Sequence, residues 1–227
     1  MLEAFIKWAG IAAQALLVSL LLLTASFVSC FLTQPPFKRE NHNSMLPAAR
    51  TQIVEVRCQA EEPPALRQGV TELFKAYFDE LSELGCDLGF QGFQNEWIDL
   101  PGKYDFEKRG GLFVAVETPN DTKLDLYNLD HSKHVVGCIA IRPLDEECGE
   151  MKRMYIRKSH RRNGIGKLMS KAIVDHAWTL GFSEIKLDSL ERLSAAVNLY
   201  EAIGFNRIDP YCECPEDDHV CMNLYRE

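Results

Sequence analysis

Hydrophobic and polar positions alternate with a two-residue period in several short segments after residue 50. Such alternation, or a short run of β-branched residues, is typical of a strand with one or both faces buried. We predict strands at residues 52–58, 111–117, 135–141, 149–157, 184–188 and 219–225. The polar stretch from residue 118 to residue 133 shows no such period, and we predict a loop there.

Three other segments show the period of a helix, with apolar residues three or four positions apart. The stripes are Val70, Leu73, Phe74, Tyr77, Leu81 and Leu84; Ile165, Leu168, Met169, Ala172 and Ile173; and Ala195, Ala196, Leu199, Tyr200 and Ile203. Gly204 follows the third stripe, at a position where helices commonly end. The resulting order, β-α-β-β-β-α-β-α-β, predicts a three-layer α/β domain with a mixed sheet.

The amino-terminal 33 residues differ in character from the rest of the chain. No charged residue occurs from Trp8 to Thr33, and an apolar run of this length can cross about 30 Å of hydrocarbon as a helix. Two interpretations remain open: a retained membrane anchor, or a cleaved signal or transit segment, because small residues follow the apolar run. We therefore divide the chain into a hydrophobic segment (1–33), a linker (34–50) and a folded domain (51–227).

The charges that flank the apolar run bear on localisation. Lys38 and Arg39 follow the run and Lys7 precedes it, which favours a single-pass membrane protein with a cytosolic C-terminal domain. The alternative is a cleaved segment and an organellar or luminal domain. The triplet at residues 120–122 is a glycosylation sequon that would be modified only in the lumen.

Composition and charge narrow the classes of function. Of the 227 residues 46% are hydrophobic, which excludes a disordered chain. The net charge is −8, and residues 51–227 hold 21 Lys and Arg against 31 Asp and Glu. An acidic domain of this kind argues against a nucleic-acid partner, which requires a basic surface.

One basic segment stands out against this acidic background. Residues 151–174 contain no Asp or Glu and eight bases: Lys152, Arg153, Arg157, Lys158, Arg161, Arg162, Lys167 and Lys171. Within the segment, Gly164 and Gly166 lie where a predicted strand turns into a predicted helix. The first amides of a helix have no intrahelical acceptor and favour an anion, and glycines let a phosphate approach closely. The segment therefore predicts a polyphosphate site, without the spacing of a Walker or dinucleotide motif.

Two motifs together resemble the GNAT superfamily of acyl-CoA N-acyltransferases. They are Arg161-x-x-Gly164-x-Gly166 and Ala196-x-x-Leu199-Tyr200-x-x-x-Gly204-Phe205. Their separation, the strand around Leu187-Asp188 and the order of elements also match over residues 51–227. Segments 100–104 and 149–156 are similar to a small-acceptor branch common in bacterial genomes. The resemblance implies an α/β/α fold whose mixed, mostly antiparallel sheet is splayed at the cofactor cleft.

The resemblance also implies which residues bind acetyl-CoA, the co-substrate of this family. Amides of the turn hold the pyrophosphate, the strand ending at residue 156 pairs with pantetheine, and one strand amide polarises the thioester carbonyl. The residues concerned are Met154, Tyr155, Ile156, Arg161, Arg162, Asn163, Gly164, Ile165, Gly166 and Lys167. Ser194 occupies a cofactor-binding position where many relatives have Asn. Tyr200 matches the tyrosine that protonates the departing thiolate.

The acceptor amine must lose a proton before or during its attack. Glu150, at the start of the predicted strand that enters the site, is the first candidate for the base, and Asp188 is the alternative. Lys152 and Arg153 could face the acceptor and favour an amine that carries a carboxylate. Among the cysteines, Cys148 keeps an acyl-enzyme route open, although direct attack is expected.

The remaining cysteines are interpreted as reduced side chains of the core and loops. Cys212, Cys214, His219 and Cys221 lie close together in sequence, and a metal site or a disulfide is the less favoured interpretation there because zinc ligands usually have other spacings. We predict no metal. The resemblance to the GNAT superfamily and the apolar segment together imply a membrane-tethered N-acetyltransferase that acts on a primary amine of a small molecule or peptide. The alternative is a non-catalytic acyl-CoA-binding module at a membrane.

Overall fold

The computed structural model describes residues 50–57, 62–86, 92–118 and 123–227. The chain divides into two units, Met1–Met45 and Leu46–Glu227, and every described residue belongs to the second. The predicted apolar segment, residues 34–49 of the predicted linker, Cys58 and the sequon at residues 120–122 lie outside the described residues. None of the helices in the described part of the chain is both long enough and apolar enough to span a membrane.

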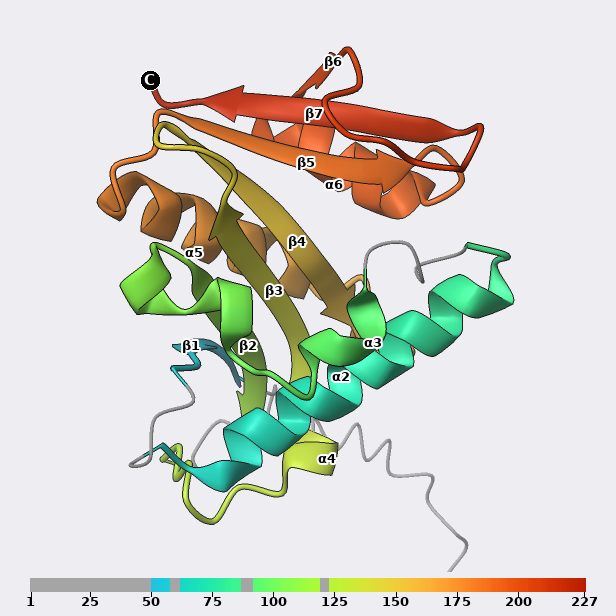
Figure 1. The fold of residues 1–227 in the computed structure, drawn as a ribbon. Coiled ribbons are helices and arrows are strands. Elements are labelled where there is room, and N and C mark those ends of the chain that lie inside the picture. Colours follow the sequence, from blue (N-terminus) through green and yellow to red (C-terminus); the bar gives the residue numbers. More distant parts are fainter. Residues whose placement is uncertain (1–49, 58–61, 87–91, 119–122) are drawn as a thin grey trace, which may run out of the picture. The chain divides into compact units, whose positions relative to one another are not determined.

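One seven-stranded sheet forms the centre of the second unit (Figure 1), in the order β1-β2-β3-β4-β5-β7-β6. The strands are β1 (Arg50–Glu55), β2 (Gly111–Thr118), β3 (Val135–Pro143), β4 (Cys148–Ile156), β5 (Glu184–Leu190), β6 (Asn206–Ile208) and β7 (His219–Tyr225). Neighbouring strands are antiparallel except for β4 and β5, which are parallel. The mixed, mostly antiparallel sheet predicted from the sequence is confirmed.

Helices cover both faces of this sheet, as the three-layer prediction requires. The longer ones are α2 (Pro64–Glu83), α5 (Ile165–Thr179) and α6 (Ser194–Ile203); the short ones are α3 (Phe93–Glu96), α4 (His131–His134), η2 (Gly102–Tyr104), η3 (Phe106–Lys108) and η4 (Lys158–His160). Helices α2 and α3 lie on one face, and α5 and α6 lie on the other (Figure 1). Each face has its own apolar cluster, with Val70, Leu73 and Phe74 of α2 in one and Ile165, Met169 and Ile173 of α5 in the other.

The observed elements depart from the predicted ones in small ways. Strand β6 has only three residues, two of them exposed, so it shows no alternation from which it could be predicted. Helix α4 forms one turn inside the predicted loop. Leu168 of α5 was expected in the buried stripe but is 48% exposed. The buried face of α5 includes Ile165, Met169 and Ile173. Leu168 is one residue before Met169, so the rotation of the helix from one residue to the next places it outside this face.

Candidate active site

Strands β4 and β5 separate part-way along their length. Their parallel pairing covers residues 148–150 of β4 and 184–186 of β5, and beyond it the two strands diverge (Figure 1). Strand β4 stays paired with β3 as far as Ile156, so from Met151 onward the β5 side of β4 has no strand partner among the described residues. An unpaired edge of this kind can hydrogen-bond an extended ligand.

A β-bulge bends β4 close to the point where the strands separate. One residue of β3, Ile139, lies opposite two residues of β4, Arg153 and Met154. Arg153 has a φ of 58°, in the left-handed region that residues with a side chain seldom adopt. Because an extra residue increases the bend and twist of a strand, the bulge accounts for the divergence of β4 from β5.

A buried ion pair holds Arg153 in this conformation. Its guanidinium donates to both carboxylate oxygens of Glu96 in α3, at 2.8 and 2.7 Å, and lies 4.1 Å from the ring centroid of Phe93. The Tyr104 hydroxyl and the Lys103 ammonium donate to the same carboxylate, at 2.8 and 2.6 Å. Burial acts to raise the pKa of Glu96, but the hydrogen bonds and charges of Arg153 and Lys103 outweigh it and lower the pKa below 4.5. Glu96 is therefore ionised at neutral pH and neutralises Arg153.

A cavity of about 100 Å³ lies where the strands diverge, with room for several atoms of a ligand. Its walls come from α2, β4, β5, α6 and the segment between β6 and β7. Met154 and Tyr200, two of the predicted site residues, line it together with Tyr77, Lys152 and Asp188. The cavity thus joins the unpaired edge of β4 to the predicted acid.

Tyr200 presents a protonated phenol to this cavity. It is 7% exposed. Burial raises its pKa above the ordinary value of 10.0, and the neighbouring Tyr77 and Asp188 raise it further. Burial likewise raises the pKa of Tyr77 to about 12. Both hydroxyls can therefore donate a hydrogen bond at neutral pH.

The two carboxylates considered as bases have different surroundings. Glu150 is 2% exposed and accepts hydrogen bonds from Arg142 at 2.6 Å, Tyr211 at 3.1 Å and Lys152 at 3.4 Å. It does not line the cavity, whereas Asp188 does. Lys152 donates to Asp188 at 2.7 Å. Burial acts to raise the pKa of Asp188, but the charge and hydrogen bond of Lys152 lower it below 3.8, so the carboxylate is ionised.

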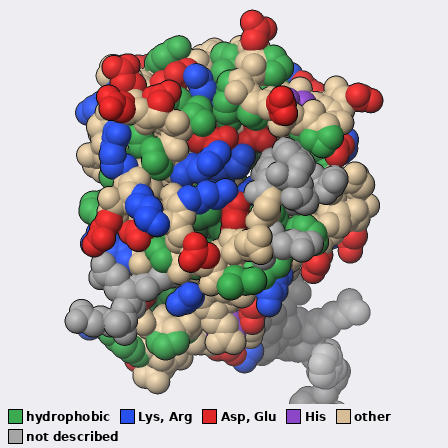
Figure 2. Space-filling model, in the orientation of Figure 1, with side chains coloured by type: hydrophobic (Ala, Val, Ile, Leu, Met, Phe, Trp, Pro, Cys, Tyr) green, Lys and Arg blue, Asp and Glu red, His purple; other side chains and the backbone are tan. Residues whose placement is uncertain are grey.

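Lys152 and Arg153 line the cavity as expected, but neither has a free charge. Lys152 pairs with Asp188 and Glu150, and Arg153 pairs with Glu96. Figure 2 shows the same mixture on this face of the molecule, where Lys and Arg side chains near the centre lie beside Asp and Glu side chains. The pairing removes the net positive charge on which the expected preference for a carboxylate-bearing acceptor depended.

The turn between β4 and α5 lies on the surface of the domain. Residues 161–164 are exposed, Arg162 and Gly164 have φ values of 66° and 79°, and α5 begins at Ile165 without a side-chain cap. The first amides of a helix lack intrahelical acceptors and form the positive end of its dipole. The turn can therefore bind a phosphate group, with Asn163 and Lys167 also exposed on it.

The two glycines of this turn have different reasons to lack a side chain. A β-carbon on Gly164 would meet no atom within 4 Å, so Gly164 is required by its left-handed φ. A β-carbon on Gly166 would lie 2.9 Å from Leu199 Cδ2 and 3.1 Å from Met154 Cε. Gly166 therefore lets α5 approach α6 and β4 closely, a packing role that the sequence analysis did not foresee.

Most of the bases near this turn are paired with carboxylates of α2. Arg161 donates to both oxygens of Glu80 at 2.8 and 2.7 Å, and also to the Ile156 carbonyl at 2.9 Å. Arg157 pairs with Glu72 at 3.3 Å. Arg162 and Lys167, in contrast, have no carboxylate partner among the described residues. The available positive charge at the turn is smaller than the count of eight bases suggests.

The other predicted residues lie around the same region. Tyr155 packs against Tyr77 of α2, with ring centroids 5.8 Å apart, and Ile156 packs on the core under α5. Ser194 is exposed at the first turn of α6. Cys148 is buried at the start of β4, where burial raises its pKa to about 12 and keeps the thiol protonated.

Sequence reasoning missed several groups that shape the site. Glu96 and Tyr211 are far from the motifs in sequence, and nothing in their neighbours identifies them as partners of Arg153 and Glu150. The six cysteines of the described part of the chain form no disulfide with one another in this structure. Cys212 was expected to be an isolated loop cysteine, but it lies beside His219 and Cys221.

Known proteins are similar to this chain in sequence and in fold. A model of the acetyltransferase (GNAT) family matches residues 78–205. An uncharacterized N-acetyltransferase of Schizosaccharomyces pombe is 33% identical over 153 residues, which cover 66% of this chain and 85% of that protein.

Solved structures show the same fold. An acetyltransferase from Streptococcus agalactiae superposes with a TM-score of 0.57 at 19% identity, covering 78% of this chain and 98% of that one. A protein from Salmonella typhimurium, solved with its cofactor acetyl-CoA, gives a TM-score of 0.53 at 14% identity, covering 77% and 93%. With more than half of its length matched by the family model, the chain belongs to the acetyltransferase (GNAT) family and is an enzyme of the acetyltransferase class.

Proposed function

We propose that this protein is an N-acetyltransferase that transfers the acetyl group of acetyl-CoA to a primary amine by direct attack. The observation that carries the proposal is the cavity between β4 and β5, which brings an unpaired strand edge and a protonated tyrosine together. The first amides of α5, which have no intrahelical acceptor and no side-chain cap, follow the end of the same strand in sequence. These are the three features that an acyl-CoA thioester requires: a phosphate site, a partner for its amide arm and a donor to its sulfur.

Acetyl-CoA binding is supported by the turn and by β4. The pyrophosphate would accept hydrogen bonds from amides of residues 161–167, with Arg162 and Lys167 adding positive charge. The pantetheine amides would pair with the open edge at residues 154–156, and Ser194 would contact the cofactor from α6. An amide of this edge would also stabilise the oxyanion that forms at the thioester carbonyl.

The proposed reaction transfers the acetyl group from the sulfur of acetyl-CoA to the nitrogen of the amine. The neutral amine nitrogen attacks the carbonyl carbon, and the carbon–sulfur bond breaks as the amide forms. The thiolate takes the phenolic proton of Tyr200, and the ammonium proton of the attacking nitrogen passes to a carboxylate or to water. No cysteine is acylated in this sequence of steps, which agrees with the buried, protonated thiol of Cys148.

We propose Asp188 as the group that receives the amine's proton. Asp188 lines the cavity, whereas Glu150 is enclosed by Arg142, Lys152 and Tyr211. A carboxylate that faces the acceptor can act directly or through one water molecule. Glu150 then orients Lys152 and Tyr211 around the acceptor and does not itself exchange a proton.

An acceptor screen tests the function. Purified protein, acetyl-CoA and single amines (free amino acids, polyamines and peptides with free amino termini) are mixed, and release of the CoA thiol is followed. We expect saturable release that depends on one class of amine, with the acetylated amine identified by mass spectrometry. Tight binding of acetyl-CoA with no release across the panel would instead favour a non-catalytic binding module. An acetylated protein formed before the amine is added would refute direct attack.

We also propose that residues 8–33 tether the enzyme to a membrane, with the catalytic domain in the cytosol. The support is the absence of charge over this run and the position of Lys38 and Arg39 after it. The alternative, a cleaved segment and an organellar or luminal domain, predicts a shorter mature chain.

A further inference from the structure

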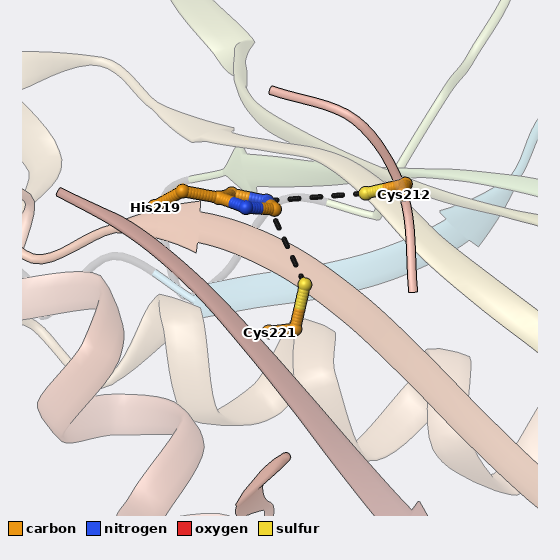
Figure 3. Close-up of side chains that lie close together, drawn as sticks. All are labelled: Cys212, His219 and Cys221. Carbon is orange, nitrogen blue, oxygen red and sulfur yellow. Dashed lines mark hydrogen bonds between the residues drawn. The ribbon is translucent and has the colours of Figure 1, made fainter. Parts of the chain in front are cut away.

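Three potential metal ligands converge on one point of the sheet surface (Figure 3). Cys212 lies in the segment between β6 and β7, and His219 and Cys221 lie two residues apart on β7. The Sγ atom of Cys212 is 3.9 Å from His219 Nε2, and the Sγ atom of Cys221 is 3.6 Å from the same nitrogen. The three atoms all lie within 4.8 Å of one another.

These separations suit a tetrahedral zinc-class ion. Zinc binds sulfur at about 2.3 Å and imidazole nitrogen at about 2.0–2.1 Å, so tetrahedral angles put the nitrogen and each sulfur about 3.6 Å apart. The two observed nitrogen–sulfur separations, 3.9 and 3.6 Å, lie within a few tenths of an ångström of this value. Hydrogen bonding explains the cluster less well, because Nε2 has one hydrogen or one lone pair and two sulfurs approach it.

The types of side chain at this point favour a zinc-class ion. Asp188 of β5, which pairs with Lys152, is directly opposite Cys221 in the register of the sheet, so a carboxylate also lies on this face. Thiolate and imidazole ligands select borderline and soft ions such as zinc over magnesium or calcium. The ligand types therefore agree with the geometry.

We propose that Cys212, His219 and Cys221 bind one zinc-class divalent ion, with water completing the tetrahedron. The ion fastens the segment that connects β6 to β7 onto β7 itself. This segment carries Tyr211, which donates to Glu150, and Cys214 and Glu216, which line the cavity. The ion is thus a structural clip for one wall of the acceptor cavity and takes no part in acetyl transfer.

Cobalt binding to the full-length chain tests the proposal. Protein stripped with a chelator and kept reduced is titrated with Co²⁺ and then with Zn²⁺. We expect a thiolate-to-cobalt charge-transfer band and the visible bands of tetrahedral cobalt, and both should disappear when Zn²⁺ displaces the cobalt. Cys212→Ser, Cys221→Ser and His219→Ala should each weaken binding by more than the roughly 10–100-fold that loss of an outer-shell partner costs.

Cys214→Ser is the matched control, because Cys214 lies two residues from Cys212 but outside the cluster. The Cys214→Ser variant should retain the cobalt bands. Any cobalt that binds to Cys30 or Cys58 would bind equally in all the variants. Acetyl-CoA binding by calorimetry checks that each variant is folded. Bands that persist in Cys212→Ser and Cys221→Ser, no bands in the unmodified protein, or a disulfide between Cys212 and Cys221 would overturn the proposal.

A second measurement needs no variant. Zn²⁺ should protect Cys212 and Cys221 of the unmodified chain from alkylation, while Cys214 is alkylated at the same rate with and without the ion. Equal alkylation of Cys212 and Cys214 in the presence of Zn²⁺ would likewise refute the site.

Discussion

Arg153 combines a strained backbone with a buried ion pair. Its φ of 58° places the bulge in β4, and Glu96 compensates its charge. Arg153→Ala should cost about 3–5 kcal/mol of unfolding free energy at pH 7, because it leaves the Glu96 carboxylate buried without its main partner. Arg153→Gly should recover about 1 kcal/mol of that loss, since glycine adopts a positive φ without strain. Urea unfolding of the three proteins measures both differences.

The pH dependence of the stability lost in Arg153→Ala gives a sharper test of this ion pair. The pKa of Glu96 is below 4.5 in the folded enzyme, so its contribution to stability is present above pH 4.5 and is lost as the pH falls through the folded pKa. Without Arg153, burial would raise this pKa, and protonation would relieve the unpaired charge. The difference in stability between the wild type and Arg153→Ala should therefore shrink from pH 7 to pH 4. A difference that stays constant would show that charge is not its source.

Tyr200 is the residue at which the proposed proton donation can be separated from binding. Tyr200→Phe keeps the buried ring but removes the hydroxyl, so kcat should fall by about 10²-fold or more while the Kd of acetyl-CoA is unchanged. Steady-state kinetics and calorimetry measure the two quantities. Weaker binding with an unchanged kcat would contradict the role of acid.

Asp188 and Glu150 make different predictions for the pH profile. The pKa of Asp188 lies below 3.8, so the carboxylate stays ionised throughout the working range. The acidic limb of kcat/KM should then follow the pKa of the acceptor amine and shift when an acceptor of lower pKa is used. Asp188→Asn should lower the plateau by about 10²-fold without moving that limb. A larger loss in Glu150→Gln would reassign the base to Glu150.

At the scale of elements, the junction of β4 and α5 can be tested with two equivalent glycines. Gly164 directly precedes α5 and Gly181 follows its other end, with φ values of 79° and 86°. A β-carbon would meet nothing within 4 Å at either glycine. Replacement by Ala should cost about 1 kcal/mol of stability at both positions. Only Gly164→Ala should weaken acetyl-CoA binding, by about tenfold or more, or ~1.4 kcal/mol. Equal affinities in the two variants would place the phosphates elsewhere.

At the scale of the whole molecule, the proposed tether predicts the behaviour of the chain in a cell. The full chain should sediment with membranes after an alkaline wash, and a chain that starts at residue 46 should be released and still bind acetyl-CoA. If the domain is cytosolic, the sequon at residues 120–122 is not glycosylated. A mass shift reversed by a glycosidase would put the domain in the lumen, and a mature chain lacking residues 1–33 would show cleavage.

Much of the fold was predictable from the sequence because the spacing of apolar residues along each segment shows which of its faces is buried. Strand β3 has no polar side chain from Val135 to Ile141 and is buried on both faces over these residues, and the stripe of α2 around Val70 and Phe74 packs as its spacing requires. The glycine turn that we propose as the phosphate site was predictable for a similar reason: its glycines and the helix that follows are contiguous in sequence.

Tertiary structure alone decided which charges meet. Arg153 pairs with Glu96, 57 positions away, and Arg161 pairs with Glu80, 81 positions away. The sequence determined the layers, the turn and the tyrosine, since each depends on neighbours in the chain. Which cations remain free, which carboxylate faces the cavity and which cysteines meet His219 depend on contacts between distant segments, and local periodicity does not specify those contacts.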